Sequence, residues 1–130
     1  MPNNDTPAMS PFGAHTGIEF LTVSTGKSHC RVTLQEHHLN NGGRVHGGVV
    51  TALADTAAGV AVRTVRPEGK SSATADLHVA FIRPPQGETL EAFAEVIHIG
   101  QRLIRTEVSV FSAEKLIAKV SAAFMLIDAK

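Results

Sequence analysis

The stretch that decides the fold is His46-Gly47-Gly48-Val49-Val50-Thr51-Ala52-Leu53-Ala54-Asp55-Thr56-Ala57-Ala58-Gly59. Its apolar residues recur at helical spacing and continue beyond Gly59 until Pro67 stops the pattern, which predicts one helix from Gly47 to about Val65. Most residues of the stretch are small, so the backbone of a sheet can approach the helix closely. Asp55 is its one carboxylate, and the residues one turn away from it carry no positive charge.

The rest of the sequence predicts strands on both sides of this helix. Residues 18–24 and 28–34 flank the turn Thr25-Gly26-Lys27 and predict a hairpin. Four further strand-like runs follow, at residues 72–83, 89–99, 102–111 and 116–127. In the first of these, period-two alternation places Thr74 and Asp76 on one face, and Leu77 and Phe81 on the other. We therefore expect an α+β domain in which a curved antiparallel β-sheet wraps around one central α-helix.

Size and composition limit the possible functions. The 130 residues are enough for one domain, expected at residues 12–130 with a short helical turn near Phe12, after a flexible N-terminal arm at residues 1–11. The 12 basic residues balance the 12 acidic ones, so we expect no partner among nucleic acids or anionic membranes. No membrane span or signal peptide is recognisable, so a cytoplasmic location is expected.

Several other chemistries lack their sequence signals. The seven histidines form no helical His-Glu-x-x-His motif and no paired-cysteine motif is present, so no metal site is expected. Gly69-Lys70-Ser71 resembles the end of a phosphate loop, but the opening glycine would have to stand at Thr64. Cys30 is expected to be a small strand residue rather than a reactive thiol. His37 and His38 are expected to be exposed loop residues.

The glycine pair at the start of the helix predicts a site for a developing oxyanion. The first amides of a helix have no internal acceptor and lie at the positive end of its dipole, so the N–H groups of Gly47 and Gly48 suit a negatively charged oxygen. Alternatively, the glycines only allow a tight turn into the helix. Asp55 in apolar surroundings suits a general base, and the alternative is a carboxylate satisfied by Thr51 or by sheet backbone.

The distance between these groups predicts a shared site. Gly47 and Asp55 are eight residues apart in sequence, which is about 12 Å along a helix axis. One carbonyl would need both groups within about 3 to 3.5 Å, and a single helix barely spans that gap. Two helices that meet antiparallel across a two-fold axis would place Gly47 of one protomer beside Asp55 of the other, so an obligatory dimer is expected.

Residues 40–59, with His-Gly-Gly followed by an Asp nine residues after the His, resemble the signature of hotdog-fold acyl-CoA thioesterases of the phenylacetic-acid-degradation (PaaI) type, also called the 4HBT superfamily. The resemblance covers about residues 12–127 and includes the strand at 73–84 and the turn at 98–103. It implies a hotdog fold and hydrolysis of an aryl- or medium-chain acyl-CoA to free acid and CoA. It also implies no separate cofactor, and a homodimer that assembles further into a tetramer.

The resemblance also implies roles for individual residues. Asp55 would be the nucleophile or general base, and the Gly47 amide would polarise the thioester carbonyl. Asn40 would help orient the thioester or the attacking water, and Thr74 would position that water. From its place before the helix, His46 is expected to order the loop through a hydrogen bond rather than act as a base. Residues expected along the substrate and CoA path are Gly48, Asp76, Phe81, His98, Gly100, Gln101, Arg102 and Leu103. Arg102 is the preferred phosphate partner, and Arg44, Arg63, Arg66 and Arg83 are further candidates.

Two other functions stay open at this point. A hotdog dehydratase would need a His paired with an acidic residue on a hydratase-type segment, and the sequence contains no such run. A non-catalytic acyl-CoA-binding protein would keep the same pocket, and an assay of thiol release distinguishes it from an enzyme.

Overall fold

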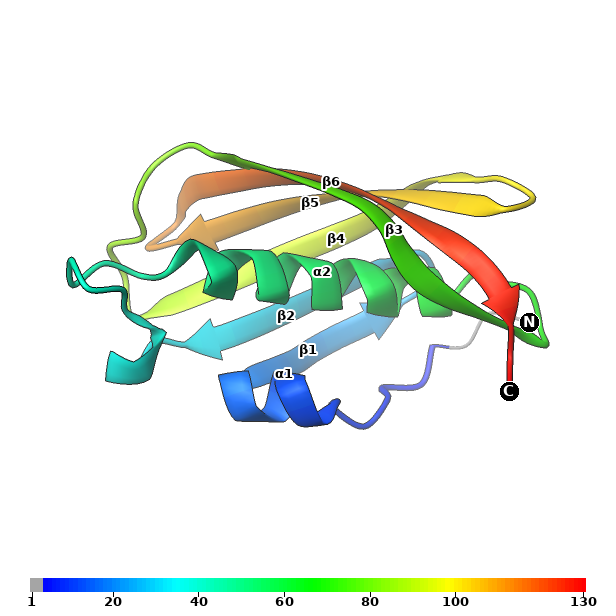
Figure 1. Cartoon of the computed structure of the whole chain (residues 1–130), viewed down its shortest axis with the longest axis horizontal. Helices are drawn as coiled ribbons and strands as arrows, with labels where there is room; N and C mark the ends of the chain where they lie inside the picture. The colour runs from blue at the N-terminus through cyan, green and yellow to red at the C-terminus, as the bar shows by residue number, and fades with distance from the viewer. Residues whose placement is uncertain (1–3) are drawn as a thin grey trace.

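The computed structural model describes residues 4–130, in which one long helix lies in the hollow of a curved six-stranded antiparallel sheet (Figure 1). In chain order the elements are α1 (Pro11–Thr16), β1 (Ile18–Ser24), β2 (Lys27–Thr33), the 3-10 helix η1 (Glu36–His38), α2 (Gly47–Arg63), β3 (Lys70–Phe81), β4 (Thr89–Ile99), β5 (Leu103–Ser112) and β6 (Lys115–Asp128). The strand order across the sheet is β1-β2-β4-β5-β6-β3. The expected α+β hotdog architecture is confirmed.

Helix α2 has a defined beginning and end. It begins at Gly47 because the side chain of His46 accepts a hydrogen bond from the Gly48 N–H group. It ends at Arg63, two residues before the predicted end at Val65, and the buried Thr64 is its C-terminal cap. The Thr64 hydroxyl donates to the Ala61 carbonyl and accepts the Gly26 N–H at 2.7 Å, which ties the helix end to the β1–β2 turn.

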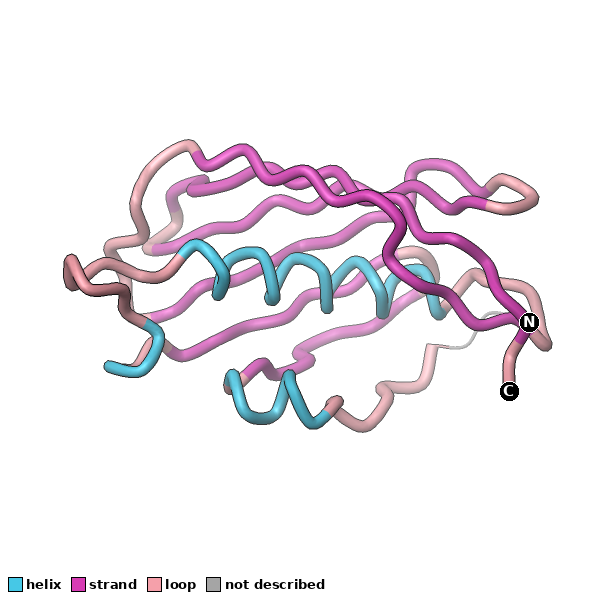
Figure 2. Tube along the Cα trace, viewed as in Figure 1, coloured by secondary structure: helices cyan, strands magenta, loops and turns pink. Residues whose placement is uncertain are grey.

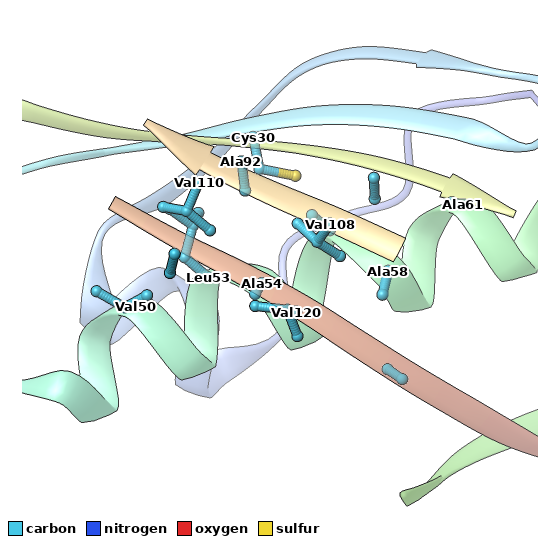
Figure 3. Packing of buried hydrophobic residues seen from close by; sticks show 14 of the residues in the cluster. Cys30, Val50, Leu53, Ala54, Ala58, Ala61, Ala92, Val108, Val110 and Val120 are labelled. Atoms are coloured by element: carbon cyan, nitrogen blue, oxygen red, sulfur yellow. The ribbon is translucent and has the colours of Figure 1, made fainter. Parts of the chain in front are cut away.

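The core lies between α2 and the sheet. Figure 3 shows Leu53 and Ala54 of α2 beside Val108, Val110 and Val120 of the strands. The first four of these side chains are fully buried and Val120 is 2% exposed. Small residues on the helix leave room for the branched strand side chains, so the helix can pack closely at ordinary core density.

Strand β3 corrects the predicted side-chain pattern. Thr74 pairs with Phe124 and Asp76 pairs with Ala123, so Ala75 is an extra residue that forms a β-bulge. The alternation changes phase there, and Thr74 faces α2, on the side that Leu77 also packs against. The prediction that Thr74 and Asp76 share a face was therefore wrong, because a period of two assumes an unbroken ladder.

Loops collect at the two ends of the sheet (Figure 2). The loop that leads into α2 and the loop after β3 lie at one end, while the β4–β5 turn lies at the other. All strand boundaries agree with the predicted runs to within two residues. These positions decide which of the predicted site residues meet within one chain.

The N-terminal segment contacts the domain at several points. The Asn4 side chain pairs with the Thr25 hydroxyl, and the Arg63 guanidinium donates to the Asp5 carbonyl at 2.7 Å. Ser10 caps α1, which confirms the short helical turn expected near Phe12. Residues 1–3 lie outside the described part of the chain, and the flexibility of the arm at residues 1–11 stays a prediction.

Cys30 is a buried residue of β2, as expected, with none of its surface exposed. Burial raises the pKa of its thiol to about 11, and a hydrogen bond with Ser28 offsets part of that rise. The thiol is therefore protonated at neutral pH and packs as a small apolar group.

We expect Cys30 to resist thiol reagents at pH 8 until urea unfolds the protein. Since the folded pKa of about 11 lies above the unfolded value of about 8.5, the folded state holds this proton more tightly. The free energy of unfolding should therefore fall as pH rises from about 8.5 towards 11. Urea titrations at several pH values measure the fall, which should be smaller in Cys30→Ala. Equal labelling rates of Cys30 in folded and unfolded protein would contradict the burial argument.

Candidate functional site

Gly47 is the first residue of α2, and its N–H group has no hydrogen-bond acceptor among residues 4–130. The helix dipole concentrates partial positive charge at this amide. Gly47 lines a depression of about 410 Å³ whose other walls are mostly apolar, formed by Asn40, Arg44, Val45, Val50, Phe81, Ile82, Arg83, Pro84, Pro85 and Ile117. A Cβ atom on Gly47 would lie 3.2 Å from the Phe81 ring, so the absence of a side chain lets that ring pack against the amide. This arrangement suits a carbonyl oxygen with an apolar group attached.

The structure separates the roles of the two glycines. The Gly48 N–H donates to Nδ1 of His46 at 2.8 Å, so the expectation that both amides serve an oxyanion is corrected to Gly47 alone. A Cβ on Gly48 would lie 2.9 Å from that Nδ1 atom, so the hydrogen bond needs glycine at this position. His46 therefore orders the start of the helix through a hydrogen bond, as expected, and this bond uses its Nδ1 atom as the acceptor.

Asn40 holds the loop that leads into α2. Its Oδ1 accepts hydrogen bonds from the N–H groups of Gly42 at 2.9 Å and Arg44 at 3.1 Å. Its side-chain NH₂ has no acceptor in the described chain, and Asn40 lines the same depression as Gly47. Because an NH₂ group only donates, Asn40 can contact a carbonyl oxygen or a water oxygen there.

Asp55 and Thr74 form the second part of the site. The Thr74 hydroxyl donates to Oδ1 of the half-buried Asp55 at 2.7 Å. Thr51 donates instead to the Gly47 carbonyl at 2.9 Å, so Thr51 does not satisfy the carboxylate. Residues 4–130 contain four ion pairs, and Asp55 takes part in none of them. Oδ2 of Asp55 is therefore available to accept a proton or to attack a carbonyl carbon.

The remaining predicted contacts lie elsewhere in the chain. Asp76 faces away from α2, since it precedes the inward-facing Leu77. The turn residues lie at the far end of the sheet from Gly47 (Figure 1), namely His98, Gly100, Gln101, Arg102 and Leu103. One chain therefore brings Asn40, Gly47 and Phe81 together, and separately joins Asp55 to Thr74.

The structure also ranks the candidate arginines. Arg63 donates to the Asp5 carbonyl, and Arg66 donates to the Ser72 hydroxyl at 3.1 Å. Arg44 and Arg83 line the Gly47 depression, and the ion pairs of the described chain include neither of them. These two guanidinium groups are thus the ones placed beside Gly47 within one protomer.

His38 was predicted to be exposed, but it is only 3% exposed. Its Nδ1 accepts the Gln35 N–H at 2.9 Å, and its Nε2 donates to the Thr16 carbonyl at 2.6 Å. Gln35 and His38 form a capping box around η1. Gln35 and His38 do not match the usual Ser/Thr-x-x-Glu/Gln pattern of such a box, so the sequence carried no signal for the burial of His38.

Two further observations concern membranes and metals. No helix in residues 4–130 is long and apolar enough to cross a membrane. The same residues contain no group of three or more His, Cys, Asp or Glu side chains that could hold a metal ion. A larger depression, of about 500 Å³, lies near His29, Phe93 and Glu107 and includes none of the predicted site residues.

Known proteins resemble this chain in sequence and in structure. The family described as the thioesterase superfamily matches residues 42–118. A Halobacterium salinarum protein provisionally named an esterase is 36% identical over 99 residues, which cover 72% of this chain and 65% of that protein. Human acyl-coenzyme A thioesterase 13 is 28% identical over 105 residues, covering 78% of this chain and 74% of its own. The structure of a point mutant of the phenylacetic acid degradation protein PaaI from Thermus thermophilus superimposes with a TM-score of 0.82 at 26% identity, covering 89% of this chain and 98% of that one.

The class that the fold and these comparisons define is a hotdog-fold protein of the thioesterase type. The chain belongs to the thioesterase superfamily, whose family match covers more than half of its length. It spans about two thirds of the length of the first curated relatives that it matches.

The His46 cap predicts a measurable contribution to stability. His46→Ala leaves the Gly48 N–H without its acceptor, so we expect a loss of about 1 kcal/mol in the free energy of unfolding. Urea denaturation measures the loss, and His37→Ala is the matched control because His37 is exposed. Equal effects of the two substitutions would show that the Nδ1 bond contributes nothing.

Proposed function

We propose that this protein hydrolyses acyl-CoA thioesters to a free acid and CoA, with Gly47 as the oxyanion donor and Asp55 as the base or nucleophile. The observation that carries the proposal is the unpaired Gly47 N–H at a helix N-terminus, beside an apolar depression that also holds the Asn40 amide. The name of human acyl-coenzyme A thioesterase 13 supports CoA as the thiol of the substrate.

The chemistry needs only groups of this chain and water. As a general base, Asp55 takes a proton from water, the oxygen attacks the thioester carbon, and the Gly47 N–H stabilises the developing oxyanion. The carbon–sulfur bond then breaks, and the CoA sulfur leaves and takes up a proton. As a nucleophile, an Asp55 oxygen attacks the carbon itself, the carbon–sulfur bond breaks, and the CoA thiolate leaves and takes up a proton. Water then hydrolyses the resulting mixed anhydride to the free acid and the Asp55 carboxylate. Single-turnover hydrolysis in ¹⁸O-water separates the routes, because only the second places label in the Asp55 carboxylate.

The site is proposed to form between two protomers. The Gly47 depression includes neither Asp55 nor Thr74, so a single chain aims these groups at different spaces. Strand β3 has twelve residues and, within residues 4–130, pairs only with β6, which leaves its other edge free for a second copy. Antiparallel pairing of two β3 edges across a two-fold axis sets two α2 helices antiparallel. Phe81 and Ile82, at 57% and 49% exposed, lie at the end of that edge and would be covered.

The depression also supports a substrate class. Its apolar wall, with Val50, Phe81 and Ile117, suits an aryl or medium-chain acyl group, while Arg44 and Arg83 suit the CoA phosphates. A two-fold axis would also bring the β4–β5 turn of the other protomer to this end, so Arg102 remains a phosphate candidate. We further propose a cytoplasmic homotetramer of two dimers that uses no cofactor apart from the CoA of its substrate.

Gly47→Pro tests the oxyanion donor. Proline removes the N–H group, yet it is tolerated at the first helical residue, and His46 has the extended backbone that precedes proline well, at φ −63° and ψ 134°. We expect kcat to fall about 10²- to 10³-fold. Gly47→Ala is the matched control, because it adds the same Cβ beside Phe81 and keeps the N–H. Similar kcat values for the two variants, measured by thiol release, would exclude this amide as the donor.

Mixing two inactive variants tests the shared site. Asp55→Asn should abolish turnover and Gly47→Pro should lower it about 10²- to 10³-fold, but a mixed dimer keeps one site with an intact Gly47 from one protomer and an intact Asp55 from the other. Refolding the two variants together in equal amounts should restore about a quarter of wild-type activity, since half of the dimers are mixed and each has one intact site. If the mixture stays as inactive as its components, each site lies within one chain. Wild-type turnover by Asp55→Asn alone would instead remove Asp55 from the mechanism.

A further inference from the structure

His38 is a buried polar residue that the chemistry above leaves without a role. Its ring nitrogens have opposite roles, since Nδ1 accepts the Gln35 N–H and Nε2 donates to the Thr16 carbonyl. The ring is therefore neutral, with its proton on Nε2. Thr16 is the last residue of α1, where carbonyl groups lack partners within the helix. The Nε2 bond thus fastens α1 to the segment that leads into α2.

The backbone of His38 is the base of a small hairpin. Its carbonyl accepts the His46 N–H at 2.8 Å, and Leu39 pairs with Val45. Further up, the Asn40 N–H donates to the Arg44 carbonyl at 2.7 Å. Asn40 lies near the tip of this hairpin, and its second strand runs directly into His46 and α2. His38 therefore links α1, the hairpin that carries Asn40, and His46, which caps α2.

Nothing else of comparable burial holds this hairpin in place within the described chain. Leu39 is 41% exposed, and residues 40–44 are all exposed. Val45 is only partly buried, although it packs against the core. The position of the Asn40 amide relative to Gly47 therefore depends on the two ring bonds of His38 more than on apolar packing.

We propose that His38 is a positioning residue for thioester hydrolysis, which acts by holding the Asn40 hairpin in register with the start of α2. The inference rests on the proposed function, because it assumes that the Asn40 amide contacts the substrate or the attacking water. A displacement of about 1 Å in such a group can lower turnover about 10²-fold. The effect of His38 should therefore appear in kcat and should depend on Asn40.

The first test compares three variants. His38→Phe fills a similar volume and removes both ring bonds, and we expect kcat to fall at least about 10-fold with little change in KM. His38→Gln keeps an N–H donor that can reach the Thr16 carbonyl, so it should recover a large part of kcat. His37→Phe is the matched control, because His37 is the exposed neighbour in sequence and should keep wild-type kcat. Wild-type kcat in His38→Phe would overturn the inference.

The decisive measurement is a double-mutant cycle with Asn40→Ala. If His38 acts through the Asn40 hairpin, the loss of kcat caused by His38→Phe should largely disappear when Asn40 is already alanine. Loss of a residue with only a structural role would lower the melting temperature, and it would lower kcat by the same factor in the wild-type and Asn40→Ala backgrounds. Such additivity of the two substitutions would overturn the inference. If His38→Phe does not fold, the same cycle is run with His38→Leu, which also removes both ring bonds, and is read in the same way.

The design separates this inference from the function that it rests on. A folded wild-type protein that releases no thiol from a panel of acyl-CoAs would overturn the proposed function and this inference together. Wild-type turnover with additive effects of His38 and Asn40 would overturn the inference alone.

Discussion

A helix cannot satisfy its own first N–H groups, and the way α2 distributes them governs the rest of this structure. The Val49 N–H bonds to the His46 carbonyl and the Gly48 N–H bonds to the His46 ring, so one residue accounts for two amides. The Gly47 N–H stays unpaired among the described residues, next to an apolar wall. An unpaired amide at such a place is costly unless solvent or a ligand supplies the acceptor. The local fold therefore contains a built-in preference for a polar ligand oxygen at Gly47.

The elements of the fold could be predicted from the sequence because their patterns are local and regular. Helical spacing predicted the start of α2, and period-two alternation predicted the bounds of every strand to within two residues. Three features escaped prediction: the bulge at Ala75, the burial of His38 and the bond that occupies the Gly48 amide. Each depends on a partner distant in sequence or on a choice between competing acceptors. Periodicity carries no information on such partners or choices.

The bulge has a consequence for the candidate site. Without the extra residue Ala75, Thr74 would face away from α2, and Asp55 would lose the hydroxyl that orients it. Asp55 lies mid-helix, where aspartate is intrinsically unfavourable, and within residues 4–130 the Thr74 hydroxyl donates a hydrogen bond to its carboxylate. The bulge in β3 therefore turns a hydroxyl towards the carboxylate, and β-bulges are common beside functional groups for this reason.

The two halves of the site differ in how they are supported. Asp55 and Thr74 belong to α2 and β3, so regular backbone hydrogen bonds and the core fix them. Asn40 belongs to an exposed hairpin that the core hardly touches, and its position is set by side-chain to backbone bonds of Asn40 and His38. Such bonds contribute only about 1 kcal/mol each to stability, so they can be lost without unfolding the domain. Substitutions around α1 and η1 should therefore affect catalysis before they affect the fold, whereas those around Asp55 act on the chemistry directly.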